Sequence, residues 1–200
     1  MLRLALIALF SATPVFADKA YFAGGCFWCV EADFERVPGV REVISGYTGG
    51  STSAPNYADP GGHFEAVEID YDPAVIGYSE LLYLFFRSIN PTDPGGQFCD
   101  RGDSYRTAVF VTNTAERTAA EAAKTAAAKV LNRRIVTFVL DAGPFWRAGS
   151  EHQDYAKGKR IVITRAGPKS QSEAYKFYRR ECGRDARLRD LWGDQAIFSR

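Results

Sequence analysis

Two thiols, two aromatic residues and a glycine pair stand together near the start of the chain, in the segment Gly24-Gly25-Cys26-Phe27-Trp28-Cys29. Apolar residues follow at helical spacing, which predicts a helix from Trp28 to about Arg36. Cys26 then lies at the helix N-terminus, where unpaired N–H groups and the helix dipole favour an anion. Because thiolate is the nucleophilic form of cysteine, this position favours a reactive thiol. The alternative is a pair of cysteines buried in an aromatic core.

Polar side chains gather in and beside two long loops, residues 49–62 and 90–104, which are rich in glycine and proline. Loops of this length are unusual in a compact domain unless they have a function. Taken singly, each polar residue has a structural explanation, such as a turn cap or a solvent-facing strand position. Together they are candidates for a site: Tyr57, His63, Glu65, Asp100, Asp103 and Tyr105.

Other kinds of protein use the same cysteines. Cys26 and Cys29 form the C-x-x-C pair of thioredoxin-like dithiol oxidoreductases, but that chemistry leaves Tyr57 and Glu65 unused. Cys26, Cys29 and His63, with Cys99, offer zinc-type ligands. The sequence lacks a second C-x-x-C pair and an H-x-x-x-H pair, so we expect no bound metal. A binding domain held by disulfides is the remaining alternative, and it leaves both loops unexplained.

The elements that position these residues follow from the hydrophobic pattern. The pattern predicts strands at residues 19–23, 40–47, 63–71, 105–112 and 135–140, and helices at 28–36, 79–88 and 114–132. The resulting order, β-α-β-β-α-β-α-β, favours an α+β two-layer sandwich with a ferredoxin-like split βαβ core. Beyond it, Ser170 to Glu173 has the capping-box pattern of a short helix, in a C-terminal tail that is otherwise predicted to be irregular.

The two ends of the chain are predicted to lie outside the catalytic domain. Residues 1–17 have the layout of a secretory signal peptide, with a basic start, a short apolar stretch and a small-residue cleavage pattern. Cleavage after Ala17 predicts an exported protein, periplasmic if the source is a Gram-negative bacterium. The domain is expected to span 18–165 and the tail 166–200.

The charge and the cysteine count restrict partners and pairings. A formal net charge of +1 argues against nucleic acid or an anionic membrane as the main partner. We expect a monomer. After export, the 4 cysteines lie in an oxidising compartment where disulfides persist, and their possible pairings stay open.

Ordered blocks of sequence between Ala20 and Tyr155 match a known pattern. The blocks are GGCFW at 24–28, GYTGG at 46–50, Tyr57, GHFE at 62–65, YDP at 71–73, DRGDSYR at 100–106 and HQDY at 152–155. This series resembles the A-type peptide methionine sulfoxide reductases, which act on the S epimer of methionine sulfoxide. The resemblance covers most of the chain that remains after cleavage.

The resemblance implies a role for each matching residue. It implies that Cys26 is the nucleophile and that Phe27 and Trp28 form the wall that holds the S-methyl group. It further implies that Glu65 is the acid and that the hydroxyls of Tyr57 and Tyr105 donate to the sulfoxide oxygen. Asp100 is implied as a supporting acid. A carboxyl group kept neutral by burial can protonate the oxygen as the S–O bond weakens.

The implied reaction leaves methionine and a sulfenic acid on Cys26. A second thiol then forms a disulfide, and an external thioredoxin-like dithiol reduces it, so no bound cofactor is expected. The implied substrates are methionine sulfoxide, free or in proteins, and the implied role is the repair of proteins after oxidative damage.

The chain departs from the family pattern in the cysteines that would regenerate Cys26. Family members often have glycine at the position of Cys29 and carry resolving cysteines in a glycine-rich tail. Three thiols are candidates for resolving Cys26: Cys29 one helical turn away, Cys182 in the tail, and Cys99 beside the second loop. We rank Cys29 first and Cys99 last. This ranking leaves Cys99 and Cys182 for a structural disulfide.

Overall fold

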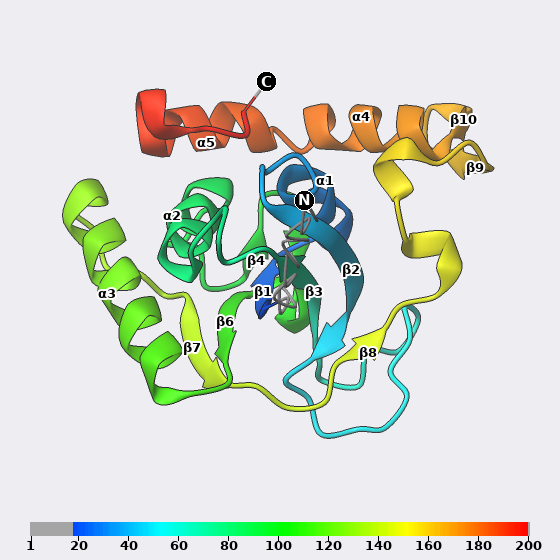
Figure 1. The fold of residues 1–200 in the computed structure, drawn as a ribbon. Coiled ribbons are helices and arrows are strands. Elements are labelled where there is room, and N and C mark those ends of the chain that lie inside the picture. The colour runs from blue at the N-terminus through cyan, green and yellow to red at the C-terminus, as the bar shows by residue number, and fades with distance from the viewer. Residues whose placement is uncertain (1–17, 200) are drawn as a thin grey trace, which may run out of the picture.

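Six strands form the central sheet of the computed structural model, which describes residues 18–199 (Figure 1). Their order across the sheet is β7-β6-β1-β3-β2-β8. The strands are β1 (Asp18–Gly24), β2 (Val40–Thr48), β3 (Phe64–Tyr71), β6 (Thr107–Val111), β7 (Phe138–Asp141) and β8 (Trp146–Arg147). The predicted signal peptide, residues 1–17, lies outside the described residues.

The centre of the sheet has the topology that the sequence predicts. β1 pairs antiparallel with both β3 and β6, and β2 pairs antiparallel with β3. Together with α1 (Phe27–Phe34) and α2 (Tyr78–Ser88), these strands make the β6-β1-β3-β2 arrangement of a split βαβ unit. The ferredoxin-like α+β core is therefore confirmed. β7 extends it as a strand parallel to β6.

Helices cover one face of this sheet and hold the main core. Val67 and Ile69 of β3 belong to a buried cluster that includes Phe34 of α1 and Phe85 of α2. The helix α3 (Thr114–Leu131) packs against α2 at the edge of the molecule (Figure 1). The opposite face of the sheet has a smaller cluster around Phe64 and Phe110. Glu65 of β3 is on the same face as Val67 and Ile69, which is the face that meets α1.

Two predicted strands are shorter in the structure than in the prediction. Residues Asp103–Tyr105 form a 3-10 turn, so β6 begins only at Thr107. The N–H of Val136 donates to the carbonyl of Pro91 at 2.8 Å, outside the sheet, and β7 begins at Phe138. The other predicted strands, and the helices before residue 140, agree with the structure to within 2 residues at each end.

The C-terminal tail is more regular than predicted. The capping box at Ser170 is present, and it begins α4 (Gln171–Glu181). A second helix, α5 (Arg184–Trp192), follows, and a hairpin of β9 (Ile161–Thr164) and β10 (Gly167–Ser170) precedes them. The predicted short helix is α4, whereas α5 and the hairpin were not predicted. Leu188 and Trp192 of α5 are buried in the main core, so tertiary packing stabilises this highly charged segment.

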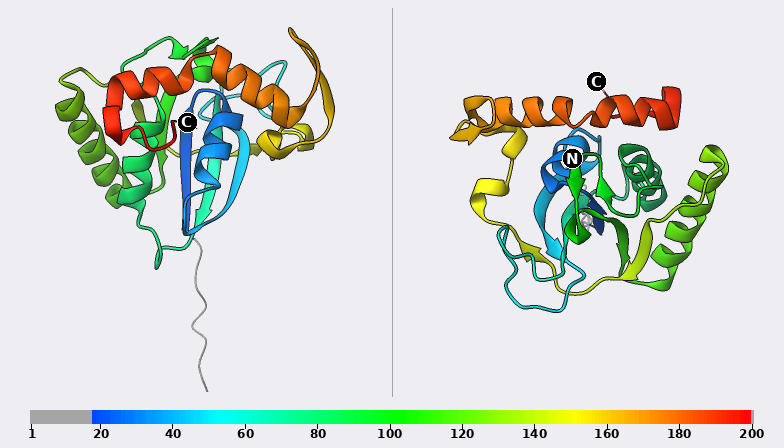
Figure 2. Two further views of the ribbon diagram at one scale, coloured as in Figure 1. Left: turned by 90° about the horizontal axis from the view of Figure 1, so that it is seen from above. Right: turned by 180° about the vertical axis from the view of Figure 1, so that it is seen from behind.

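Figures 1 and 2 show α4 and α5 end to end across one end of the molecule, above α1 and α2. A small hairpin, β4 (Gly96–Gln97) and β5 (Asp100–Arg101), lies in the second long loop. The helices α4 and α5 thus form a cover over the N-terminus of α1, where the sequence predicts the site.

Among residues 18–199, we find no helix whose length and apolarity suit it to crossing a membrane.

Candidate active site

Cys26 stands at the turn between β1 and α1, as the N-cap residue of the helix. Gly25 makes the turn with a φ of +80°, and a Cβ there would lie 2.5 Å from the Cβ of Gln97. Glycine is therefore required both by the backbone conformation and by the space. The carbonyl of Cys26 accepts from the N–H of Cys29 at 3.0 Å, and its thiol is partly exposed at the helix N-terminus.

Glu65 approaches Cys26 from the sheet. Phe22 of β1 pairs with Val67 of β3, so Glu65 is level with the end of β1. Its Oε2 accepts from the N–H of Phe27 at 3.1 Å, and the residue is only 4% exposed. Burial, with a smaller contribution from the negative charge of Asp100, raises the pKa of Glu65 to about 8. The carboxyl group is therefore mostly protonated at neutral pH.

Tyr57 and Tyr105 bring the two long loops together beside this carboxyl group. Both hydroxyls lie close enough to Glu65 for its charge to affect their pKa values. Burial is the main cause that raises the pKa of both tyrosines above the ordinary value. Both hydroxyls thus keep their protons at neutral pH.

An aromatic cluster forms the wall next to the thiol. The ring of Trp28 stacks on Tyr155 with 3.8 Å between centroids, and Tyr57 lies 5.9 Å from Trp28. His152 stacks on Tyr57 at 4.6 Å, whereas Phe27 is 0% exposed and supports the wall from behind. The sequence analysis assigned no role to His152 or Tyr155, although both belong to the last of the resembling blocks.

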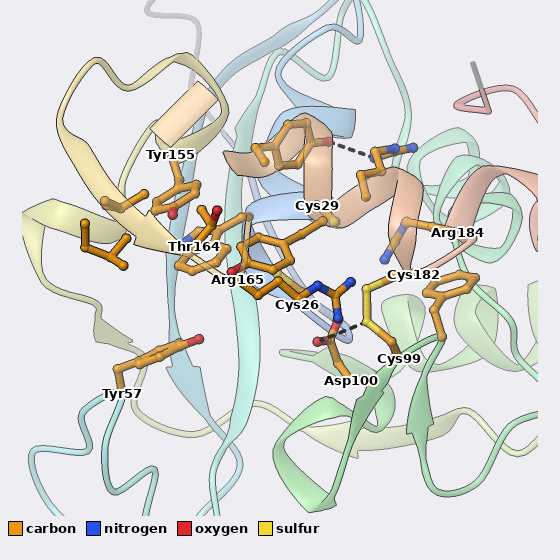
Figure 3. Close-up of a pocket in the computed structure, with 17 residues that line it drawn as sticks. Cys26, Cys29, Tyr57, Cys99, Asp100, Tyr155, Thr164, Arg165, Cys182 and Arg184 are labelled. Atoms are coloured by element: carbon orange, nitrogen blue, oxygen red, sulfur yellow. Dashed lines mark hydrogen bonds between the residues drawn. A yellow bond between two sulfur atoms is a disulfide. The ribbon is translucent and has the colours of Figure 1, made fainter. Parts of the chain in front are cut away.

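A cavity of about 430 Å³ opens at this wall (Figure 3). Cys26, Trp28 and Cys29 line it from α1, and Tyr57 lines it from the first long loop. The remaining lining includes Tyr155 and residues of β9, α4 and α5, together with Cys99, Asp100 and Cys182. Phe27, Glu65 and Tyr105 do not line this cavity themselves. The C-terminal tail, in which sequence reasoning sought only a resolving cysteine, therefore supplies a large part of the pocket.

Cys26 and Cys29 are free thiols one helical turn apart. The interaction with the Cys26 thiol, aided by the positive charges of Arg184 and Arg179, lowers the pKa of Cys29 to about 7. The same interaction, together with burial and the charge of Glu65, raises the pKa of Cys26. The sequence analysis placed the anion on Cys26, whereas these surroundings favour ionisation of Cys29.

Two buried arginines of the tail differ in their partners. Arg179 forms ion pairs with Asp33 at 3.0 Å and with Asp185 at 2.8 Å. Arg184 is 2% exposed and lines the cavity, and its Nη2 donates to the carbonyl of Ser88 at 2.7 Å. Within residues 18–199, no carboxylate forms an ion pair with Arg184, and its Nε has no hydrogen-bond partner. Its charge is thus available to the thiol pair.

Cys99 and Cys182 are joined by a disulfide. Cys182 caps the C-terminus of α4, and Cys99 lies in the turn between β4 and β5. The disulfide ties the tail to the second long loop, next to Asp100. Burial raises the pKa of Asp100, while Arg184 opposes this rise. This is the pairing that remains when Cys29 is ranked first as the partner of Cys26.

The sequence of this chain was compared with those of known proteins. The family model described as peptide methionine sulfoxide reductase matches residues 18–189. The chain is 48% identical over 198 residues to "Peptide methionine sulfoxide reductase MsrA 2" of Caulobacter vibrioides, covering 94% of each chain. It is 44% identical over 182 residues to the MsrA of Bacillus licheniformis, covering 88% of this chain and 94% of that one.

Solved structures agree with the fold. Mxr1 from Saccharomyces cerevisiae in its reduced form has a TM-score of 0.68 and 25% identity, covering 74% of this chain and 88% of that chain. Methionine sulfoxide reductase A of Corynebacterium diphtheriae has a TM-score of 0.63 and 29% identity, covering 73% and 76%.

Proposed function

The chain belongs to the peptide methionine sulfoxide reductase family, and we propose that it reduces methionine-S-sulfoxide, free or in proteins, through a sulfenic acid on Cys26. In this proposal Glu65 is the acid, Tyr57 and Tyr105 hydrogen-bond the sulfoxide oxygen, and Trp28, backed by Phe27, holds the S-methyl group. Asp100 is a supporting acid, because its charge helps to keep the pKa of Glu65 high.

The observation that supports the proposal best is a buried neutral carboxyl group beside a reactive thiol. A sulfoxide sulfur is a poor electrophile until its oxygen is protonated or strongly hydrogen-bonded. Glu65, with a pKa of about 8, holds the required proton at neutral pH. The hydroxyls of Tyr57 and Tyr105 are positioned donors for the charge that develops on the oxygen.

The proton balance of the first step involves both thiols. As the sulfur of Cys26 attacks the sulfoxide sulfur, its proton passes to the neighbouring Cys29 thiolate, whose pKa is about 7. The proton of Glu65 passes to the sulfoxide oxygen. The S–O bond of the substrate breaks and an S–OH bond forms on Cys26. The substrate sulfur is reduced to the thioether of methionine, and Cys26 is oxidised to the sulfenic acid.

Cys29 is the proposed resolving thiol. Its sulfur attacks the sulfenic sulfur of Cys26, a disulfide forms between them, and the hydroxyl group leaves as water. The separation of the two cysteines by one helical turn supports this pairing, and the disulfide already present at Cys99 and Cys182 leaves no other free thiol among residues 18–199.

Regeneration requires an external dithiol, and a thioredoxin-like protein is the proposed donor. It reduces the disulfide between Cys26 and Cys29 and becomes oxidised itself. The signal-peptide pattern of residues 1–17 supports export, to the periplasm in a Gram-negative source, where the enzyme acts in protein repair. We propose that it works there as a monomer.

A stereospecific assay with dithiothreitol as reductant tests the proposed function. Methionine should form from methionine-S-sulfoxide and not from the R epimer, which serves as the matched control substrate. Equal turnover of both epimers, or turnover of neither, contradicts the proposal.

A further inference from the structure

The hairpin β9–β10 is an isolated two-stranded sheet at the mouth of the cavity. It has no strand partner in the central sheet, and β9 pairs with β10 alone. One edge of β9 therefore has backbone N–H and C=O groups that no strand of the described chain uses. Such an edge is able to pair with an extended peptide.

The free edge of β9 borders the cavity. Successive side chains of a strand point to opposite faces, so a strand that offers one face contributes every second residue. Val162, Ile163 and Thr164 of β9 line the cavity consecutively, and so does Arg165 in the turn after the strand. Three consecutive lining residues within one strand indicate that an edge, rather than a face, meets the cavity. Because β10 occupies the other edge, this edge is the unpaired one.

The same strand also exposes two apolar side chains. Ile163 is 80% exposed and Ile161 is 64% exposed, more than any other large apolar residue of the described chain. They stand two positions apart on β9, so they share one face. Exposed aliphatic pairs beside a binding site are typical of surfaces that contact apolar groups of a partner.

The position of the thiol determines what crosses this edge. Cys26 and Thr164 line the same cavity (Figure 3). A substrate that reaches Cys26 through this cavity therefore lies near β9. A free amino acid has no further residues to place along the strand, whereas a polypeptide has neighbours on both sides of the methionine sulfoxide.

We propose that the free edge of β9 binds the backbone of an extended polypeptide substrate by strand addition, with Ile161 and Ile163 contacting apolar side chains that flank the methionine sulfoxide. This inference rests on the proposed function and narrows its substrate class. The preferred substrate is then an extended, apolar segment of an oxidised protein rather than the free amino acid.

The test compares two substrates on one pair of variants. The substrates are free methionine-S-sulfoxide and a blocked peptide in which valines flank methionine-S-sulfoxide. In the double variant Ile161→Ser with Ile163→Ser, we expect KM for the peptide to rise about tenfold, because two aliphatic contacts are lost. Because Ile163 also lines the cavity, the deciding readout is the ratio of the KM for the peptide to the KM for the free amino acid, which should rise by a similar factor. The matched control is Val75→Ser, which changes an apolar residue that is 61% exposed elsewhere.

Backbone pairing has its own readout. N-methylation of a peptide amide removes a donor, and only alternate residues of an added strand bond the edge. Methylating one of two adjacent amides should therefore raise KM for the wild type, while methylating its neighbour should not.

Different results would contradict the proposed reductase activity and the proposed substrate binding at the edge of β9. If wild type turns over neither substrate, the proposed function is wrong. If the double variant keeps the wild-type KM for the peptide, the edge does not bind substrate and this inference is overturned. It is also overturned if sedimentation shows a dimer that only the double variant loses, since β9 then pairs with a second copy of the chain.

Discussion

The two cysteine pairs of this protein lie around one cavity but differ in almost every local property. Cys26 and Cys29 are one helical turn apart, and both are free. Cys99 and Cys182 are separated by 83 positions in the sequence and form a disulfide. Cys29 is 9% exposed, whereas Cys99 is exposed to solvent.

The surroundings of the pairs differ as much as their spacing. The first pair is next to a protonated carboxyl group on one side and a buried arginine on the other, so its protons are poised near neutral pH. The second pair joins two segments that build the cavity wall. The difference teaches that spacing and surroundings together distinguish a pair suited to redox chemistry from one suited to holding loops together.

The largest expected effect comes from removing one thiol of the first pair. Cys26→Ser should lower reductase activity by at least about 10³-fold, because the nucleophile is lost. The matched control is the double variant Cys99→Ser with Cys182→Ser, which should keep most of the activity with dithiothreitol. Methionine release measures both. Similar losses in the two proteins would erase the distinction between the pairs.

The acid beside the first pair should give the next largest effect. Glu65→Gln should slow the first step about 10²-fold, a typical contribution of a general acid. In wild type the single-turnover rate should rise through about pH 7 as Cys29 loses its proton, and fall above about pH 8 as Glu65 loses its own. The falling limb should vanish in Glu65→Gln. Glu68→Gln on the same strand is the control, and a limb that persists in Glu65→Gln removes Glu65 from the acid role.

Loss of Cys29 should separate the two steps of the reaction. Cys29→Ser should still release one equivalent of methionine, more slowly because the thiolate that accepts the proton is gone, and then accumulate the sulfenic acid. Dimedone labelling followed by mass spectrometry measures the adduct on Cys26. Full thioredoxin-driven turnover in Cys29→Ser would show that another thiol resolves the sulfenic acid.

The second pair should matter for stability. Opening its disulfide with Cys99→Ser and Cys182→Ser frees a loop of 83 residues, which should lower the free energy of unfolding by about 4 kcal/mol. Thermal and urea unfolding measure this loss. A variant as stable as wild type that has lost turnover would instead place this disulfide in the catalytic cycle.

The smallest expected effect concerns the positive charge of Arg184 near Cys26 and Cys29. Arg184→Gln should raise the pKa of Cys29 and shift the pH profile of thiol alkylation upward, because Arg184 supplies positive charge to the buried thiol. Arg180→Gln, at an exposed arginine of α4, is the control. Identical profiles in wild type and Arg184→Gln would exclude this electrostatic role.

How much of the fold and the site can be predicted from the sequence depends on how far apart in the chain the contacting residues are. The strands and helices before residue 140 have clear apolar periodicity, and their order was sufficient to predict the ferredoxin-like core. The residues around Cys26 were recognisable because they recur in ordered blocks. In the tail, only the capping box of α4 gave such a signal. α5 is held by the burial of Leu188 and Trp192 against distant elements, and β9 is an apolar run of only 4 residues.

The proton location was also beyond sequence reasoning. A helix N-terminus favours an anion at Cys26, and this effect is local and readable from the pattern. The lowering of the Cys29 pKa comes first from Cys26 and then from Arg184, which is 155 positions away in the chain. Only the fold brings the two together, because α5 lies across α1 and α2.

Peptide mapping of the oxidised protein tests the central claim most directly. The full chain, with its Cys99–Cys182 disulfide intact, is mixed with one equivalent of methionine-S-sulfoxide without reductant, digested and analysed by mass spectrometry. The account predicts a new disulfide between Cys26 and Cys29, together with the unchanged one between Cys99 and Cys182. A disulfide between Cys26 and Cys182 would contradict it.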